Sequence, residues 1–247
     1  MTRFSLVTAA LNAERTLRQC IDSVRAQSVP VEHMLIDGAS SDATLAIAGE
    51  YPDHFARIVS EPDEGLYCAM NRGLALATGD IVGILNADDF YVSGDVLAAV
   101  AEAFNDAAVA ACYGDLEYVA ADGERVVRRW RAGAFGRDKF FNGWMPPHPA
   151  LFFRRSVYER FGLYREDLGT SADYEFMLRV FVKHGLTASY IPRVLVRMRQ
   201  GGASNRSLGA RWRANRGDAL AWRVNGLRPR PWTVLAKPLR KAGQWWV

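Results

Sequence analysis

Two adjacent aspartates, Asp88 and Asp89, follow a short apolar run at residues 81–85. The run predicts a buried strand, so both carboxylates would stand at its carboxyl end. Neighbouring acids raise each other's pKa, and a divalent cation removes that electrostatic cost. Hard oxygen ligands suit Mg²⁺ or Mn²⁺, and Mg²⁺ typically binds through one or two carboxylates together with substrate phosphates. The segment therefore predicts a metal–diphosphate site at the rim of an α/β sheet. Capping of the next helix is the alternative role for the two acids.

The elements that would position this site alternate between strand and helix signals, which predicts a parallel α/β sheet in the first half of the chain. Strands are expected at 4–9, 33–37, 57–59 and 81–85, and Asn12 is expected to cap the first helix. Ligands of open α/β sheets bind beyond the carboxyl ends of the strands. Asp37 ends the second expected strand, although the pair Asp37-Gly38 taken alone favours a plain turn.

The second half of the chain shows a different order of elements. The expected elements are a helix at 97–104, strands at 109–113 and 125–130, helices at 156–161 and 173–183, a strand at 187–191 and a long basic helix at 206–225. No internal repeat or low-complexity linker divides the chain. The simplest organisation is one α/β domain at 1–204 and a basic, Trp-rich helical extension at 205–247.

The charge of the protein is unevenly distributed. From residue 193 to the end there are thirteen Arg and Lys and one acid, whereas the rest of the chain carries a net charge of −8. Such asymmetry favours an anionic partner for the tail. Trp beside Lys and Arg is typical of a membrane–water interface, so an anionic membrane surface is favoured over nucleic acid. A helix packed on the domain is the alternative. The tryptophans of this region are Trp212, Trp222, Trp232, Trp245 and Trp246.

Cysteine spacing and hydropathy limit the cellular setting. Cys20, Cys68 and Cys112 are far apart and form no CxxC pair, which favours small buried residues over a disulfide framework or a metal site. Strand signals begin at residue 4, which leaves no room for a signal peptide, and no apolar run reaches roughly 18 residues. The expected location is cytoplasmic, either soluble or peripheral on the inner face of the cell membrane.

Five segments taken together resemble the family-2 glycosyltransferases, of the type that builds bacterial surface polysaccharides. The segments are residues 5–14, 36–44, 61–73, 85–89 and 171–175, in the order and spacing of that family from about residue 2 to 202. The resemblance implies the GT-A fold, an α/β architecture with a mixed central sheet and helices on both faces. It also implies inverting transfer of a sugar from a nucleotide-diphosphate donor to a hydroxyl acceptor. The Gln-x-x-Arg-Trp motif of processive synthases is not present, which favours addition of a single sugar.

Matching the segments residue by residue assigns the donor side of the site. Asp88 and Asp89 would hold Mg²⁺ or Mn²⁺ against the diphosphate. Asn86 stands where relatives often carry Asp, which keeps an oxygen acceptor but removes a charge. Glu14 could equally be a helix-start acid favoured by the helix dipole, and Arg72 a solvated helical cation. The residues expected to bind the donor nucleotide are Thr8, Ala10, Glu14, Asp37, Asn71, Arg72, Asn86 and Asp88.

The same matching assigns the catalytic base. An acceptor hydroxyl has a pKa far above neutral, so its attack on the anomeric carbon needs a general base. Asp173 matches the family's catalytic carboxylate, although Ala172 precedes it where many relatives carry Glu. An N-terminal helix acid is the alternative role for Asp173.

A proline-rich loop and a glycine pair are further candidates on the acceptor side. His148, within Pro-Pro-His-Pro, could bind the acceptor or a metal, or form a structural hydrogen bond. Arg199 together with Gly201 and Gly202 resembles a flap that closes over the donor diphosphate. Position 68 is often acidic in relatives, and Cys68 departs from that pattern.

The expected function is the transfer of one sugar to a saccharide or lipid-linked polysaccharide precursor. A non-catalytic glycosyltransferase-like scaffold is the first alternative, because Cys68, Asn86 and Ala172 depart from the family. A sugar nucleotidyltransferase is disfavoured, since residues 8–12 form no Gly-rich basic loop. No GxGxxG follows the first strand, which disfavours a dinucleotide oxidoreductase.

Overall fold

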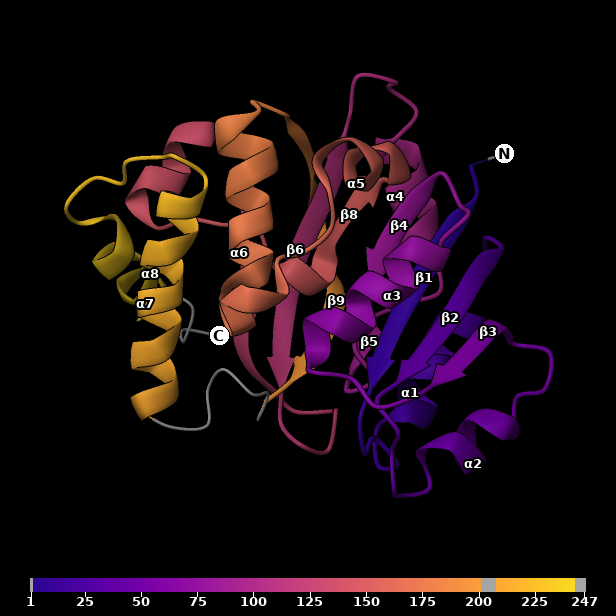
Figure 1. Ribbon diagram of the computed structural model, residues 1–247. Coiled ribbons are helices and arrows are strands. Elements are labelled where there is room, and N and C mark those ends of the chain that lie inside the picture. The colour runs from indigo at the N-terminus through magenta and orange to yellow at the C-terminus, as the bar shows by residue number, and fades with distance from the viewer. Residues whose placement is uncertain (1, 201–207, 243–247) are drawn as a thin grey trace.

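The computed structural model describes residues 2–200 and 208–242 (Figure 1). Within these ranges a nine-stranded sheet runs in the order β3-β2-β1-β4-β8-β6-β9-β5, with β7 paired to β6. The first four strands are parallel to one another, whereas β4 and β6 pair antiparallel with β8. The sheet is therefore mixed, as the family resemblance implies.

The expected elements of the first half are present, in the expected order. Parallel strands alternate with helices that return the chain to the same end of the sheet. The elements are β1 (Phe4–Ala10), α1 (Leu17–Arg25), β2 (Val31–Asp37), α2 (Thr44–Gly49), β3 (Phe55–Ser60), α3 (Leu66–Leu76), β4 (Ile81–Ile84), β5 (Asp89–Tyr91) and α4 (Val96–Ala103). The short strand β5 was not expected.

The second half differs from the expectation in three strands, one of which is β6, which continues to Val119 beyond the predicted end at 113. The antiparallel strand β8 was not expected, and β9 continues well beyond the predicted end at 191. The elements are β6 (Ala111–Val119), β7 (Val126–Trp130), β8 (Leu151–Arg154), α5 (Arg155–Phe161), α6 (Ala172–Met177), β9 (Ala188–Arg199), α7 (Leu208–Val224) and α8 (Thr233–Ala242). Short irregular helices η1 (Arg137–Asn142), η2 (His148–Ala150), η3 (Glu166–Ser171) and η4 (Leu178–Lys183) complete the order, and η4 continues α6.

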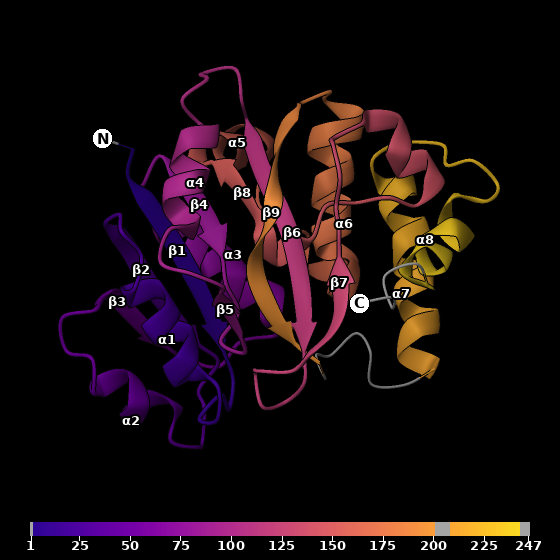
Figure 2. The same cartoon turned by 180° about the vertical axis from the view of Figure 1, so that it is seen from behind.

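Helices cover both faces of the sheet because side chains along each strand alternate between two apolar clusters. Val7 and Ala9 of β1 belong to the cluster that α3 and α6 share, whereas Phe4 and Leu6 belong to the cluster of α1 and α4. Figure 2 shows α1 and α4 in front of the strands, on the face of the sheet that is turned away from the viewer in Figure 1.

The C-terminal helices pack on the domain. In both views α7 and α8 stand beside α6 rather than apart from it. Ala221 and Trp222 of α7 are fully buried in the cluster that contains Phe176 of α6. Among the described residues, no helix is both long and apolar enough to cross a bilayer.

Candidate active site

Three strand ends meet at one edge of the sheet and bring the donor-side residues together. Ala10 and Asp37 are register partners at the ends of β1 and β2. The segment after β4 continues alongside β1, where the Ala87 N–H donates to the Ala9 carbonyl at 3.2 Å. The predicted donor residues Ala10, Asp37, Asn86 and Asp88 therefore share one edge, as the strand order requires.

Asp37 is fully buried at this edge and held by hydroxyl and amide donors. Ser60 Oγ donates to its Oδ2 at 2.6 Å, and the Ser40 N–H donates to the same oxygen at 3.0 Å. A Cβ at the neighbouring Gly38 would lie 2.8 Å from Asp63 Oδ2, so a larger residue there would displace the Asp63 side chain. Asp37 is thus a fixed, buried acceptor beneath the site.

Glu14 and Asn12 join two loops rather than starting a helix. Glu14 Oε2 accepts the Ala43 N–H at 3.1 Å, and Asn12 Oδ1 accepts the Ser41 N–H at 3.0 Å. Asn12 has a φ of 51°, and α1 begins only at Leu17. The expectation that Asn12 caps the first helix is therefore wrong, because its side chain is used between the loops. These bonds give the loop after β1 a defined shape at the edge of the site.

Thr8 lies beneath the site in a buried chain of polar groups. Its Oγ1 shares a hydrogen bond of 2.9 Å with His33 Nε2, and His33 Nδ1 shares one of 2.6 Å with His54 Nε2. Thr8 and His33 are fully buried. Burial, and secondarily the neighbouring His54, lowers the pKa of His33 well below its ordinary value. Thr8 therefore supports the end of β1 from the interior of the protein.

We expect the free energy of unfolding to decrease as the pH falls below 6.5, the ordinary pKa of His33, whose pKa is lowered in the folded protein. Over that window the unfolded chain binds a proton that the folded protein does not, and one such proton contributes up to about 1.4 kcal/mol per pH unit. Urea unfolding across this range measures the slope, and His33→Gln should reduce it. His184→Gln, at an exposed histidine, is the matched control. An unchanged slope in His33→Gln would contradict the assignment.

Asp88 and Asp89 differ sharply in their surroundings. Asp88 is half-buried, and burial raises its pKa, although Arg199 acts in the opposite direction. Asp89 is fully buried in β5, and burial together with Asp88 raises its pKa well above the ordinary value. Neither carboxyl oxygen of Asp89, nor Oδ1 of Asn86, has a hydrogen-bond partner among the described residues. The segment 86–89 thus contains buried oxygens that a cation would stabilise.

Arg199 is buried at the end of β9, where it contacts this segment. Its guanidinium donates to the Asp88 carbonyl at 2.7 Å and to the side chain of Gln19. It also lies over the Phe90 ring, 5.1 Å from the centroid. In this arrangement Arg199 fixes the backbone that carries Asp88. Gly201 and Gly202, predicted to form a flap with it, lie outside the described residues.

Asn71 and Arg72 are adjacent on α3 but contact different parts of the protein. The Asn71 amide donates to the Tyr164 carbonyl at 2.9 Å and to Glu166 Oε1 at 2.8 Å, while its own oxygen accepts the Tyr164 N–H at 3.0 Å. Asn71 therefore joins α3 to the segment before α6. Arg72 forms an ion pair of 3.0 Å with Glu61 and leaves its Nη1 buried without a partner among the described residues.

A second cluster surrounds Asp173 at the start of α6. Burial, and next the Asp173 carboxylate, raises the pKa of the Tyr67 phenol well above its ordinary value. Burial lowers the pKa of His148, and Asp173 acts in the opposite direction. His148 Nε2 shares a hydrogen bond of 3.2 Å with the Tyr164 hydroxyl, and the Tyr67 and Tyr164 rings meet edge to face at 5.5 Å. Asp173 is thus a half-buried carboxylate between aromatic and imidazole groups.

The C-terminal helices hold the residue that follows Asp173. Tyr174 is buried, and its hydroxyl accepts the Trp222 indole N–H at 3.1 Å. Lys237 Nζ of α8 lies 3.7 Å from the centroid of the Tyr174 ring and forms a 2.8 Å ion pair with Asp218 of α7. The basic extension therefore supports the helix that carries Asp173, whatever further partner it has.

Several residues of these clusters were not among the predicted site residues. Tyr67 lies within residues 61–73, one of the segments that carried the family resemblance, so the sequence offered a signal by which it could have been predicted. Tyr164 and Ser60 carried no sequence signal, because their roles depend on chain segments that meet only in the folded protein. The residues are Ser40, Ser60, Tyr67, Tyr164 and Glu166.

Known proteins resemble this chain in sequence. The family model "Glycosyl transferase family 2" matches residues 5–162. A PGL/p-HBAD biosynthesis glycosyltransferase of Mycobacterium bovis is 34% identical over 211 residues, which cover 82% of this chain and 79% of that protein. Both findings agree with the resemblance carried by the five sequence segments.

Solved structures share the fold at low sequence identity. Staphylococcus aureus TarS residues 1–349, in complex with UDP-GlcNAc, superposes with a TM-score of 0.70 at 15% identity, covering 90% of this chain and 65% of that chain. The mannosyltransferase PcManGT from Pyrobaculum calidifontis, in complex with GDP-Man and Mn²⁺, gives a TM-score of 0.65 at 20% identity, covering 98% and 74%. This chain thus spans about two thirds of the TarS fragment. From its sequence match and its architecture, the chain belongs to glycosyl transferase family 2 and has the GT-A fold.

Proposed function

We propose that this glycosyltransferase transfers one sugar, with inversion, from a nucleotide-diphosphate donor to a hydroxyl of a saccharide or lipid-linked precursor. The observation that carries the proposal is the pairing of two clusters: buried acceptors at the strand ends, and the carboxylate Asp173 on α6. The donor nucleotide is proposed to bind over Ala10, Asp37 and the segment 86–88. Asp37, with its fixed hydrogen bonds, offers a preorganised acceptor to the nucleoside.

The residues at 86–89 fit a divalent cation. Carboxylate and amide oxygens suit Mg²⁺ and Mn²⁺, and the oxygens of Asn86 and Asp89, unpartnered within the described part of the chain, lie beside the half-buried Asp88. We assign Asp88 and Asp89 as the holding carboxylates, with Asp88 the more accessible. When bound, the cation would neutralise negative charge on the leaving diphosphate. Arg199 contributes by fixing the Asp88 backbone, and Arg72 lies on α3 with its Nη1 unpartnered among the residues that the structure describes.

Asp173 is proposed to take the proton from the acceptor hydroxyl. A general base must lie within hydrogen-bond reach of that proton, and Asp173, at the start of its helix, is only half-buried. Tyr67 and His148 line the same cluster and would orient the acceptor. The raised pKa of Tyr67 and the lowered pKa of His148 favour the neutral phenol and the neutral imidazole. Neither side chain therefore adds a charge beside the Asp173 carboxylate.

A lipid-linked acceptor is favoured by one exposed patch. Trp232 and Leu235 are exposed near α8, and Arg228 and Arg230 lie close by in the chain. Exposed aromatic and aliphatic groups beside arginines are typical of a membrane–water interface. We propose that this patch meets an anionic membrane surface, so that the enzyme acts at the inner face of the cell membrane.

Nucleotide diphosphates together with Mn²⁺ are expected to raise the thermal unfolding midpoint. A ligand at about 100 times its Kd stabilises the folded state by roughly 2.7 kcal/mol. A panel of UDP, GDP and dTDP, each with and without Mn²⁺, identifies the base. Asp88→Asn should remove most of the Mn²⁺-dependent part of the shift while leaving the unliganded midpoint nearly unchanged.

Asp53→Asn, at an exposed acid distant from the strand ends, is the matched control and should behave like the unchanged protein. Stabilisation by nucleotide that is the same with and without Mn²⁺ would contradict the metal assignment. Failure of every nucleotide to stabilise would favour the scaffold alternative over an enzyme.

A further inference from the structure

An irregularity in the sheet separates β6 from β9 at one point. Tyr113 pairs with Tyr190 and Asp115 pairs with Val194, so three residues of β9, 191–193, stand opposite Gly114 alone. Pro192 lies in this bulge, where its missing N–H costs no ladder hydrogen bond. Gly114 is required for the return of β9, since a Cβ there would lie 2.4 Å from Leu195 Cγ. The bulge is therefore built into both strands.

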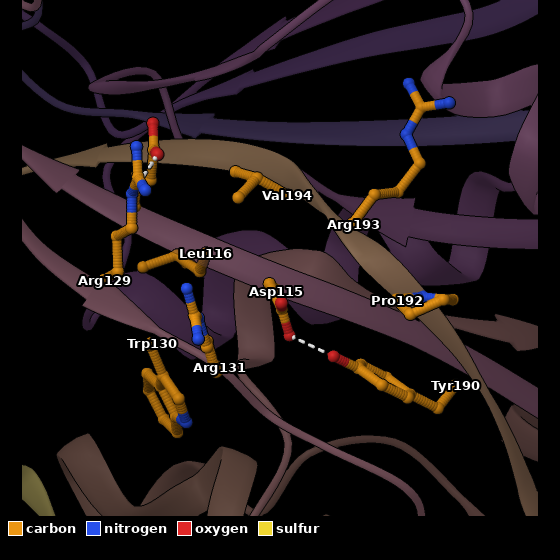
Figure 3. Close-up of a pocket in the computed structure, with 10 residues that line it drawn as sticks. Asp115, Leu116, Arg129, Trp130, Arg131, Tyr190, Pro192, Arg193 and Val194 are labelled. Carbon is orange, nitrogen blue, oxygen red and sulfur yellow. Dashed lines mark hydrogen bonds and ion pairs between the residues drawn. The ribbon is translucent and has the colours of Figure 1, made fainter. Parts of the chain in front are cut away.

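A cavity of about 490 Å³ lies at this bulge, between β7, β6 and β9 (Figure 3). It shares no residue with the two clusters of the candidate active site. Its volume lies within the range of small-molecule sites. The apolar and aromatic lining comes from Leu116, Trp130, Tyr190, Pro192 and Val194, and the charged lining from Asp115, Glu117, Arg129, Arg131 and Arg193.

Most polar groups of the cavity wall are fixed by one another. Asp115 Oδ1 accepts the Tyr190 hydroxyl at 2.8 Å (Figure 3). The same oxygen accepts the Ala132 N–H at 2.8 Å. Glu117 is buried between two guanidinium groups, those of Arg129 at 2.8 Å and Arg197 at 3.0 Å. These contacts preorganise the wall, which lowers the entropic cost of binding a ligand.

Arg193 has an ion-pair partner, whereas Arg131 has none among the described residues. Arg193 forms an ion pair with Asp95 at 2.6 Å and also donates to Ser93. Arg131 is exposed, and it makes no hydrogen bond or ion pair with the residues that the structure describes. Among the wall residues and the rest of the described chain, Arg131 is thus the lining cation left without an ion pair.

From this lining we infer a second ligand site, for a saccharide unit that carries a single carboxylate. The fork of Arg131 matches a carboxylate, the Tyr190 ring adds an aromatic surface to the lining, and Asp115 keeps acceptor capacity for sugar hydroxyls. A polyphosphate is disfavoured, because Asp115 and Glu117 would repel its multiple charges. The site goes beyond the proposed transfer reaction and would bind an acidic glycan apart from the strand-end site.

Titration of the full chain with glucuronate, observed through the Trp indole N–H resonances by NMR, tests the inference. The Trp130 resonance, identified by its loss in Trp130→Phe, should shift saturably with glucuronate. Glucose and inorganic phosphate at equal concentration should produce much smaller shifts. Arg131→Gln should raise the Kd for glucuronate roughly 10-fold or more, a loss of about 1.4 kcal/mol.

Arg57→Gln, at an exposed arginine of β3, is the matched control and should leave the Kd unchanged. Because Arg131 is exposed, its replacement should also leave the thermal midpoint and donor turnover unchanged. Three outcomes would overturn the inference: no saturable shift with glucuronate, an equal shift with phosphate, or an unchanged Kd in Arg131→Gln. Since the readout is binding at Trp130, a failed transfer assay would count against the proposed function alone.

Discussion

Replacement of Asp173 by Asn should lower turnover about 10²- to 10⁴-fold, the range that general-base catalysis typically contributes. The amide keeps the size and the hydrogen-bonding shape of the side chain but cannot take a proton at neutral pH. Donor affinity should change little, since the strand-end cluster is built without Asp173. Steady-state kinetics with the donor identified by thermal shift measures kcat and KM separately.

Asp167→Asn is the matched control for this prediction. Asp167 lies in the neighbouring η3 helix, is exposed, and forms a surface ion pair with Arg165. Exposed pairs contribute roughly 0–1 kcal/mol, so the control should retain nearly full turnover. Unchanged turnover in Asp173→Asn would show that another group is the base. A protein that binds nucleotide but transfers no sugar to any acceptor would instead support the scaffold alternative.

Trp222→Ala is expected to lower the free energy of unfolding by about 3–5 kcal/mol, the usual cost of removing a large buried ring. Trp222 is 0% exposed, packs on the Phe141 ring, and donates its indole N–H to Tyr174. Loss of that donor also leaves a buried hydroxyl without its partner. Urea or thermal unfolding measures the change, and turnover should fall with it because Tyr174 adjoins Asp173.

Trp232→Ala is expected to weaken membrane binding while leaving the stability of the fold nearly unchanged. Trp232 is 52% exposed, so its replacement should change the free energy of unfolding by no more than about 0.5 kcal/mol. Sedimentation with anionic lipid vesicles should show weaker binding of Trp232→Ala than of the unchanged protein. If Trp232→Ala destabilised as much as Trp222→Ala, the division into a packed and an exposed tryptophan would be wrong. Equal vesicle binding would remove the support for the membrane patch.

The fold of the first half was predictable because its signals are local. Apolar runs of strand length alternate with residues at helical spacing, and each strand ends in polar groups such as Asp37 or Asn86. Parallel strands must then bring these ends to one edge. The strands β5 and β8, three and four residues long, were missed. Both are stabilised by pairing with strands distant in sequence, β9 in one case and β4 and β6 in the other.

The candidate site divides in the same way. Residue types and order alone indicated the strand-end acids and Asp173, since segment order reflects the family. The contacts of each side chain could not be predicted from the sequence. Asn71 bonds to Tyr164, and Arg199 bonds to Asp88 and Gln19. The partners in these contacts lie 93 to 180 positions apart in the chain. The role of Glu14 was likewise not predictable, since its carboxylate accepts the N–H of Ala43 in another loop.

The sequence by itself determined the architecture, the family and the positions where acids gather at strand ends, because these depend on local patterning and order. Only the tertiary structure decided what each side chain contacts. It buried Trp222 and exposed Trp232, although both stand in the same basic, Trp-rich stretch. It also separated Asp88 from the fully buried Asp89, its neighbour in the chain. The reason is physical: burial and hydrogen bonding are set by the segments that pack around a residue, and those segments come from elsewhere in the chain.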